Sequence, residues 1–360
     1  MEPKKIAVLP GDFIGPEVIN AALEILEVSS TIFDFEVDVT SYPFGGGAVE
    51  NFGDPLPEQT RAAVVNADAV LMGSSGGPVG DHPWNQLPRE LRVETGILNL
   101  RRLLGVFANL RPVTVFAGLE HLSPLREEVA TGTDMLILRE LTGGIYFGKP
   151  SYNRKDQGLA TMVYDRHEVE RIARIAFESA IQRSGKVTNV DKANVLDVSQ
   201  FWRDVVVGVH ASEFPQITLE HLYVDNAAMQ IVQVPKEFDV VVTGNIFGDI
   251  LSDLAAVIPG SIGVLPSASL GGNIGLFEPV HGSAPDIAGA GIANPVGTIL
   301  SVSMMLRYGC GQAGAAEAID NAVQIALAKG STKDLGGNLT TTDMTQAIIE
   351  ALRNQIPLNQ

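Results

Sequence analysis

The sequence contains very little cysteine, which limits how the fold can be held together. Cys310 is the single cysteine among 360 residues. One cysteine cannot form a disulfide within the chain, and chains without disulfides suit a reducing compartment. The first residues, MEPKKIAVLPGD, carry two lysines without a long apolar segment after them. No signal peptide is therefore expected there, and the expected location is cytoplasmic.

Long apolar runs and positive charge are also lacking. No window approaches the roughly 18–20 uninterrupted apolar residues that a membrane-spanning helix needs. Lys and Arg number 25 against 42 Asp and Glu, which gives a formal net charge of -17. Nucleic acids and acidic membranes are not expected as partners, because both attract basic surfaces. An anionic small substrate would require a local cluster of arginines.

Several common nucleotide and nucleophile motifs are absent. No G-x-G-x-x-G follows an apolar strand and opens a helix, so an ordinary Rossmann fold is not indicated. The glycines of GGGAVENFG, near residue 45, lack that spacing. P-loop and G-x-S-x-G patterns are missing too. A bound nucleotide would therefore have to be held by another kind of loop.

What the sequence does contain is a regular alternation of short apolar strands and amphipathic helices. Hydrophobic residues make up 45% and charged residues 19% of the chain, as in a folded protein, and the length suits two domains. Strand-helix alternation predicts a largely parallel sheet with helices on both faces. The stretch GGIYFGKPSYNRKDQGLATMVYDR predicts an extended hairpin or arm.

Two acids interrupt the otherwise apolar helix predicted for TGNIFGDILSDLAA. Asp249 and Asp253 lie four residues apart, so they project from one helical face. Their charges repel, and burying an unpaired carboxylate is costly. Mg²⁺ or Mn²⁺ would remove the repulsion, and a solvated face or a helix cap is the alternative. Asp225 begins a helix after the strand HLYV, where a capping role is the simplest interpretation.

Three arginines follow or end predicted elements, where loops commonly form sites. They are Arg101, Arg111 and Arg139. Guanidinium groups match carboxylates with two parallel hydrogen bonds. Together they could hold a dicarboxylate or tricarboxylate, and surface salt bridges are the alternative for each one.

Two further side chains and one loop are candidates for chemistry. Tyr146 is flanked by glycines, which permit close approach of a ligand, in TGGIYFG. Lys192 lies between short apolar stretches, where partial burial can turn a lysine into a base. In the loop 281–295, small residues would let main-chain N–H groups approach a nucleotide, and Asp286 could accept hydrogen bonds from a ribose diol. Structural roles for the two side chains and an ordinary surface loop are the alternatives.

Seven motifs in a fixed order carry a family resemblance. They are ETGILNLRR, FANLRP, LRELTGGIYFG, VDKANVL, YVDNAAM, GNIFGDILSDLAA and LFEPVHGSAPDIAGAGIANP. From about residue 4 to the C-terminus, the chain resembles the β-decarboxylating dehydrogenases, the family of isocitrate and isopropylmalate dehydrogenases. The resemblance implies an α/β fold of two domains, non-Rossmann, with a β arm and helices at a dimer interface. The cofactor-binding domain would comprise residues 1–106 and 260–360, and the substrate, metal and dimerisation domain residues 107–259.

The resemblance also implies an activity. The family oxidises a 2-hydroxy acid with NAD or NADP and decarboxylates the product, with Mg²⁺ or Mn²⁺ bound. Ile97 and Leu98 stand where the isopropylmalate enzymes face the substrate's side group, and apolar side chains suit an isopropyl group. The expected reaction converts (2R,3S)-3-isopropylmalate to 2-oxoisocaproate and CO₂ in leucine biosynthesis. The alternatives are a sibling enzyme for homoisocitrate, isocitrate or tartrate, and a metal-binding homologue without activity.

Roles for individual residues follow from the matched motifs. Lys192 would take the hydroxyl proton through water, and Tyr146 would return a proton after CO₂ leaves. The arginines would grip the malate carboxylates, and Lys192 and Asp225 would reach the site from the partner subunit of a homodimer. The implied substrate-binding residues are Arg101, Arg111, Arg139, Asp225, Glu94, Ile97, Leu98 and Val195. The implied metal ligands are Asp225, Asp249 and Asp253.

The cofactor choice and two departures complete the expectations. A carboxylate at Asp286, followed by Ile287, favours NAD because it repels a 2′-phosphate. Phe13 in GDFIGPE replaces a glycine that is more usual in the family, and the loop PVGDHPWNQLPRE looks slightly longer than usual, with His82 expected to be exposed. The implied cofactor contacts are Gly77, Glu94, Asn194, His281, Gly282, Ser283, Ala284, Pro285, Asp286, Ile287 and Asn294.

Overall fold

The computed structural model describes residues 2–78, 80 and 82–355 and divides into two compact units. Unit 1 comprises Met1–Val106, Phe116–Leu122 and Ser261–Gln360. Unit 2 comprises Phe107–Val115 and Ser123–Gly260. The segment Phe116–Leu122 therefore packs with unit 1, whereas the sequence predicts it in the second domain.

Unit 1 is built on five strands in the order β2-β1-β3-β12-β11. The first four are parallel to one another, and β11 runs antiparallel to β12. Because parallel strands end at the same edge of a sheet, the loops that follow β1, β2, β3 and β12 meet at one edge. The strands are β1 (Lys4–Leu9), β2 (Val37–Ser41), β3 (Ala69–Met72), β11 (Pro266–Leu270) and β12 (Gly275–Pro279).

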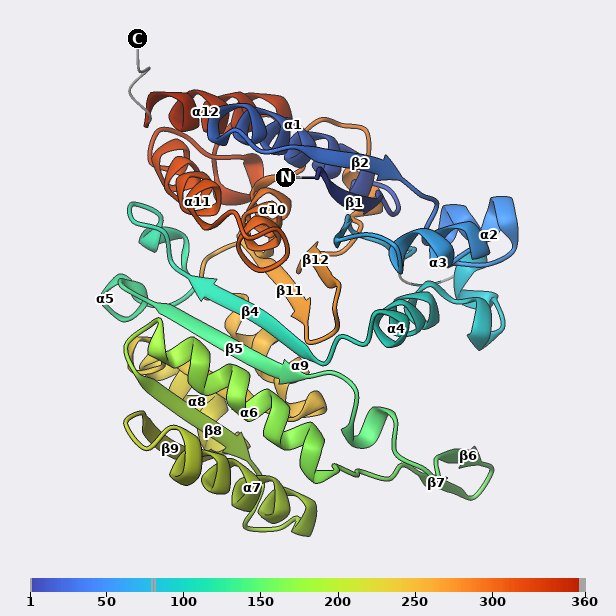
Figure 1. Ribbon diagram of the computed structural model, residues 1–360, viewed down its shortest axis with the longest axis vertical. Coiled ribbons are helices and arrows are strands. Elements are labelled where there is room, and N and C mark those ends of the chain that lie inside the picture. The colour runs from blue at the N-terminus through green and yellow to red at the C-terminus, as the bar shows by residue number, and fades with distance from the viewer. Residues whose placement is uncertain (1, 79, 81, 356–360) are drawn as a thin grey trace. The chain divides into compact units, whose positions relative to one another are not determined.

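Helices cover the sheet of unit 1, and those from the two ends of the chain lie side by side (Figure 1). The apolar stripe of α1, which includes Val18, Ala22 and Ile25, is fully buried, as its periodicity predicts. No helix in the described part of the chain combines the length and apolar character needed to cross a membrane. The helices are α1 (Gly15–Phe33), α2 (Gly46–Phe52), α3 (Glu58–Val64), α4 (Val93–Leu104), α10 (Val296–Tyr308), α11 (Ala313–Leu327) and α12 (Thr341–Asn354).

Unit 2 has a matching plan, with five strands in the order β4-β5-β10-β8-β9. Strands β5, β10, β8 and β9 are parallel, and β4 is antiparallel to β5. Figure 1 shows α6 and α7 on the near face of this sheet and α8 and α9 on the far face. The strands are β4 (Ala108–Thr114), β5 (Asp134–Glu140), β8 (Lys186–Asp191), β9 (Thr218–Tyr223) and β10 (Val240–Thr243). The helices are α5 (Glu127–Ala130), α6 (Arg166–Ile181), α7 (Asp197–Glu213), α8 (Val224–Gln233) and α9 (Asn245–Ala255).

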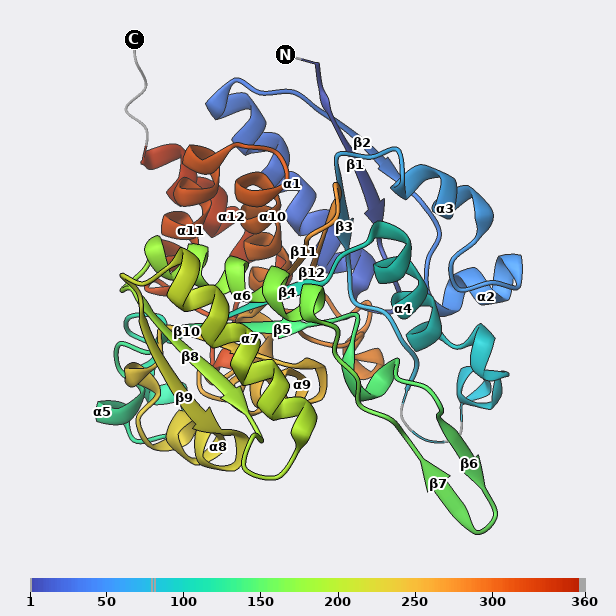
Figure 2. The ribbon, with the colours of Figure 1, turned by 60° about the horizontal axis from the view of Figure 1, so that its bottom comes forward.

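A two-stranded hairpin extends from unit 2 as an arm (Figure 2). It consists of β6 (Tyr152–Arg154) and β7 (Gln157–Leu159), which pair antiparallel. Most of its residues are exposed, and its alternating sequence predicts this extended form. The structure confirms the arm expected from the sequence.

Three glycines in unit 2 make room for a buried tyrosine behind α9. Tyr164 is 8% exposed, and its hydroxyl oxygen accepts the backbone N–H of Asn245, the first residue of α9, at 2.7 Å. A Cβ at Gly144 would lie 2.4 Å from that hydroxyl oxygen, and a Cβ at Gly244 would lie 2.7 Å from it. A Cβ at Gly143 would lie 2.8 Å from the ring. Glycine at these positions therefore allows Tyr164 to satisfy one free N–H at the start of α9.

We predict that Gly144→Ala destabilises the protein by about 2 kcal/mol or more. Gly144 has a φ of +79°, which disfavours any side chain, and the added Cβ would displace the Tyr164 hydroxyl. Gly158→Ala, in the hairpin, is the matched control, because no described heavy atom lies within 4 Å of its added Cβ. Urea unfolding measures both, and equal midpoints for the two variants would contradict the assigned packing.

Candidate active site

The candidate catalytic residues of unit 2 lie where its parallel strands end. Arg139 is the penultimate residue of β5 and lies opposite Thr243, the last residue of β10. Lys192 directly follows β8, whose last residue lies opposite the end of β9. Asp225 comes two residues after β9, in the first turn of α8. Ligands of parallel α/β sheets bind at this edge, so the strand order gathers these side chains at the right place.

The guanidinium of Arg139 is fixed by two residues of α9. Its Nε and Nη2 both donate to Oδ1 of Asn245, at 3.0 and 2.9 Å, and its Nη1 donates to Asp249. Arg139 is 5% exposed and Asn245 is 1% exposed. Asn245 also donates from Nδ2 to the carbonyl of Gly143 at 3.2 Å. A buried charge needs such partners, and here they set the direction of the guanidinium.

Tyr146 joins this group through the second oxygen of Asp249. Its hydroxyl donates to Asp249 Oδ2 at 2.8 Å, and the Tyr146 side chain remains half exposed. Burial of part of the phenol and the Asp249 hydrogen bond raise the pKa of Tyr146 above its usual value. The phenol therefore keeps its proton at neutral and mildly alkaline pH, as a proton donor must.

The second acid of α9 has an arginine of its own. Arg111, on β4, donates from Nη1 to Asp253 Oδ1 at 3.0 Å and to Ser252 Oγ at 2.9 Å. Its Nε donates to Asn109 Oδ1 at 2.8 Å. Each acid of the repelling pair thus faces one guanidinium within the same chain. The sequence predicts the arginines and the acids at one site, but not that they pair with each other.

Lys192 and Asp225 form a separate ion pair. Lys192 Nζ donates to Asp225 Oδ1, and this hydrogen bond holds the pKa of Asp225 below its usual value. The preceding residue, Asp191, is buried and anchors the turn. Its carboxylate accepts the N–H of Ala193 at 2.9 Å and two hydrogen bonds from Arg203 at 2.8 and 2.7 Å. Asp191 and Asn245 are not among the site residues predicted from the sequence, and their only signal is a polar residue at, or two residues after, the end of an apolar strand.

The three implied metal ligands do not meet in a single chain. Among the described residues, no three His, Cys, Asp or Glu side chains gather as a metal-binding group. Asp249 and Asp253 share one face of α9. Asp225, on α8, pairs with Lys192 instead. The α9 carboxylates are hard oxygen donors, which suit Mg²⁺ or Mn²⁺. Among the described residues, one chain therefore brings together two of the three implied metal ligands.

In unit 1, Asp12 ties together the loops at the carboxyl edge of the sheet. Its buried carboxylate accepts the N–H groups of Gly46, Gly47 and Gly76 at 2.9, 3.0 and 3.0 Å. Ser283 adds the loop after β12, since its Oγ donates to the Gly76 carbonyl at 2.8 Å. Its own carbonyl accepts the N–H of Ile14 at 3.1 Å. We call these four joined segments the unit 1 rim: residues 10–15, 42–47, 280–295, and the described residues 73–78, 80 and 82–92.

The loop 281–295 leaves its main chain open where a ligand could approach. No described heavy atom lies within 4 Å of the position that a Cβ would take on Gly282. The same holds for Gly76, in the segment after β3. Burial lowers the pKa of His281, so its ring is neutral, and its Nε2 has no hydrogen-bond partner among the described residues. An open backbone beside an unsatisfied ring nitrogen fits a nucleotide.

The other implied cofactor contacts differ in their exposure. Asp286 is exposed on a short 3₁₀ helix, Pro285–Ile287. Ala284 and Ile287 pack against the buried cluster of Ile14, Val18 and Ala293, so they anchor the loop. Asn294 is buried, with Nδ2 donating to Asp334 at 3.0 Å and Oδ1 accepting the N–H of Val296 at 3.0 Å, which is a structural arrangement.

The substrate-facing residues implied for α4 share one face of that helix. Glu94, Ile97, Leu98 and Arg101 follow the spacing that aligns side chains on a helix. Arg101 pairs with Glu278 of β12 at 3.0 Å, and both side chains are largely buried. Arg101 thus belongs to unit 1, whereas Arg111 and Arg139 belong to unit 2.

The remaining residues named from the sequence lie in a turn of unit 2 and in the segment around Trp84 of unit 1. Asn194 and Val195 are exposed in the turn before α7. Gly77 lies close to Trp84, whose indole would be 3.0 Å from a Cβ at that glycine. His82 is half-buried against the Trp84 ring rather than exposed, because the two rings pack edge to face at 5.1 Å.

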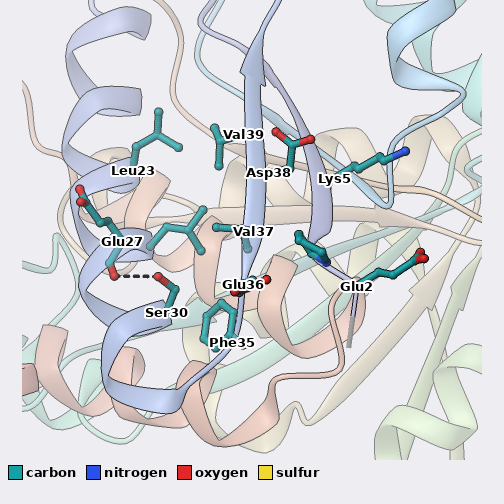
Figure 3. A pocket seen from close by; sticks show the side chains of 12 residues that line it. Glu2, Lys5, Leu23, Glu27, Ser30, Phe35, Glu36, Val37, Asp38 and Val39 are labelled. Atoms are coloured by element: carbon teal, nitrogen blue, oxygen red, sulfur yellow. Dashed lines mark hydrogen bonds between the residues drawn. The ribbon is translucent and has the colours of Figure 1, made fainter.

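A groove of about 1020 Å³ lies at the other end of the unit 1 sheet. Figure 3 shows Val37 and Val39 of β2 facing α1 across it. It contains none of the candidate site residues, so it does not belong to the candidate site. Its lining residues are Glu2, Pro3, Lys5, Leu23, Leu26, Glu27, Ser30, Phe35, Glu36, Val37, Asp38 and Val39.

Comparison with known proteins identifies the family. A family model described as isocitrate/isopropylmalate dehydrogenase matches residues 5–348. The chain belongs to the isocitrate/isopropylmalate dehydrogenase family. It is 53% identical over 348 residues to a 3-isopropylmalate dehydrogenase of Deinococcus radiodurans, covering 97% of both chains. It is 50% identical over 363 residues to the chloroplastic 3-isopropylmalate dehydrogenase 1 of Arabidopsis thaliana, covering 98% of this chain and 88% of that one.

Solved structures of the family share the fold. An isocitrate dehydrogenase of Methylococcus capsulatus matches with a TM-score of 0.83 at 35% identity, covering 97% of this chain and 99% of that one. A β-decarboxylating dehydrogenase of Thermococcus kodakarensis matches with a TM-score of 0.81 at 37% identity, covering 98% of this chain and 96% of that one. Both the family and the α/β fold expected from the sequence are confirmed.

We predict that Asp249→Asn lowers the pKa of Tyr146 from its raised value toward the ordinary one. The substitution removes the negative charge that disfavours the phenolate, while the burial that also raises the pKa remains. The phenolate absorbance in the near ultraviolet, taken as a difference from Tyr146→Phe, measures the titration. An unchanged pKa would show that Asp249 does not control the phenol.

Proposed function

We propose that the protein catalyses the NAD-dependent oxidative decarboxylation of (2R,3S)-3-isopropylmalate to 2-oxoisocaproate and CO₂, the dehydrogenase step of leucine biosynthesis. Relatives named for this substrate are about half identical to the chain over nearly its whole length. The observation that carries the proposal is the pairing of both α9 acids with arginines beside Tyr146. We place the enzyme in the cytoplasm, with Mg²⁺ or Mn²⁺ as the resident ion.

The two arginine-acid pairs suit an exchange of partners. A malate dianion presents carboxylates to Arg111 and Arg139, whose guanidinium groups bind them with two parallel hydrogen bonds each. Asp249 and Asp253 are then released toward a dication. Charge stays balanced throughout, which avoids the cost of leaving a buried guanidinium unpaired. Asp249 and Asp253 would hold the dication, which would supply Lewis-acid chemistry at the substrate oxygens.

Two residues of the chain handle the protons. Lys192 would take the proton of the substrate hydroxyl through water in its neutral amine form, which it can reach once Asp225 turns from the ion pair to the dication. Bound NAD would supply the hydride acceptor. Tyr146 Oη, which keeps its proton because its pKa is raised, delivers that proton to the carbon that has lost CO₂. Asp249 orients the phenol for this transfer through the hydrogen bond at 2.8 Å.

Substrate and cofactor choice rest on two surfaces of unit 1. Ile97 and Leu98 present aliphatic side chains on the same face of α4 as Arg101, and each buried methylene contributes about 0.8 kcal/mol. An isopropyl group matches the Ile97 and Leu98 side chains, whereas a third carboxylate would have to be desolvated against them. The exposed carboxylate of Asp286 favours the ribose diol of NAD over a 2′-phosphate.

A homodimer with shared sites accounts for the separation of the acids. Large apolar side chains are exposed on α8 and α9, with Met229 54%, Ile250 58% and Val257, just beyond α9, 52% exposed. Asp225 lies four residues before Met229, so both project from one side of α8. A second copy that covered this apolar face would bring its own Asp225 and Lys192 toward the α9 acids.

Mixing two inactive variants tests the shared site. We expect Lys192→Met and Tyr146→Phe each to lose nearly all activity alone. After denaturation and joint refolding, about half of the dimers would be mixed, each with one intact site of two. Recovery of about a quarter of the wild-type kcat is expected. If both residues served the same chain's site, the mixture would stay inactive, and refolded wild-type protein controls for yield.

A panel of 3-substituted malates tests the reaction. With NAD, kcat/KM for 3-isopropylmalate should exceed that for unsubstituted malate by about tenfold or more, because the apolar contact is lost in the latter. NADP should be the poorer cofactor. Higher kcat/KM for isocitrate, homoisocitrate or tartrate would show a sibling enzyme, and no turnover of any substrate would show an inactive homologue.

A further inference from the structure

Phe13 adopts a backbone conformation that its side chain disfavours. Its φ is +52°, in the left-handed region, where glycine is tolerated and a bulky residue is strained. It directly follows Asp12, the residue that ties the unit 1 rim together. A glycine here would remove the strain, so the aromatic ring must contribute something that offsets it.

The ring of Phe13 meets an indole that is fixed on several sides. The ring centroids of Phe13 and Trp84 lie 5.5 Å apart. Trp84 Nε1 donates to Glu50 Oε1 at 2.9 Å, and His82 packs edge to face on the indole. A Cβ at Gly46 would lie 2.1 Å from the indole ring. Trp84 is therefore contacted by Phe13 of the first rim segment, by His82 of its own segment, and by Glu50 of α2, and it packs over Gly46.

The aromatic pair keeps part of its surface free at the rim. Phe13 and Trp84 are each only half-buried. Gly77, a candidate cofactor contact, lies against the indole, while Gly76 beside it has open space. Two tilted aromatic rings, with part of their surface exposed, thus stand next to an accessible main chain, at the edge where parallel α/β sheets bind ligands.

We infer that Phe13 and Trp84 form an aromatic wall of the dinucleotide site, against which a heteroaromatic ring of NAD packs. The inference rests on the proposed function, since it requires NAD to bind at the unit 1 rim. Stacked aromatic rings contribute beyond the area that they bury, and NAD carries two such rings. The wall makes Phe13 a residue that strengthens cofactor binding in this chain.

Calorimetric titration with NADH tests the role of Phe13 directly. Phe13→Gly and Phe13→Ala should each weaken binding about fivefold or more, and Phe13→Tyr, which retains the ring, should bind as the wild type does. The thermal midpoint of Phe13→Gly should not fall, because glycine relieves the strain at φ +52°. Phe52→Ala, which removes an exposed ring at the other end of α2, is the matched control and should bind normally.

Tryptophan fluorescence locates the ring contact. The chain has two tryptophans, and Trp202 is buried in unit 2, so Trp84 reports on the rim. NADH should quench the emission of the wild type, and Trp84→Phe should lose most of that quenching when both proteins are saturated with NADH, with saturation established by calorimetry.

The outcomes separate this inference from the proposed function. If Phe13→Gly and Phe13→Ala bind NADH within about twofold of the wild type, or change only the thermal midpoint, the ring is structural and the wall is rejected. Quenching that survives Trp84→Phe rejects it as well. If the wild type does not bind NADH by either method, the proposed dehydrogenase activity fails along with the wall.

Discussion

The ion pair between Arg139 and Asp249 is the interaction on which the candidate site depends. A guanidinium that is 5% exposed must be paired and hydrogen-bonded, and α9 supplies both partners through Asn245 and Asp249. This requirement attaches the start of α9 to the end of β5. It also fixes the two acids on a face where Tyr146 and Arg111 can reach them. The position of α9 and the charge pattern of the site therefore have one cause.

Much of the architecture could be predicted because it follows local periodicity. The strand-helix alternation, the apolar stripe of α1 and the arm are all encoded in short windows of sequence. The pairing of Arg139 with Asp249 could not be predicted this way, because it spans 110 residues and depends on the strand order β5-β10. The sequence showed two repelling acids and three arginines, but only the register of the sheet decided which group faces which.

Buried polar anchors were the least predictable part of the site. Asp12, Asp191 and Asn245 each look like ordinary turn or cap residues in the sequence. Their importance appears only when N–H donors or guanidinium groups from distant segments converge on them, as three glycine N–H groups do on Asp12. Phe13 was visible as a departure from the family motif. Its partner Trp84 was not, because nothing local connects the two residues.

The occupied state of the α9 acids has a thermodynamic consequence. An ion that approaches Asp249 or Asp253 must compete with a guanidinium already in contact with each carboxylate. An anion that approaches Arg111 or Arg139 must likewise compete with the carboxylate already paired with that arginine. A cation that binds an acid frees its arginine for an anion, and an anion that binds an arginine frees its acid for a cation. The two affinities are therefore positively linked, and such linkage is reciprocal by necessity. Without ligands, the chain would thus bind a metal ion weakly in the absence of the anion, and the anion weakly in the absence of the metal ion. It would bind each more tightly when the other is present.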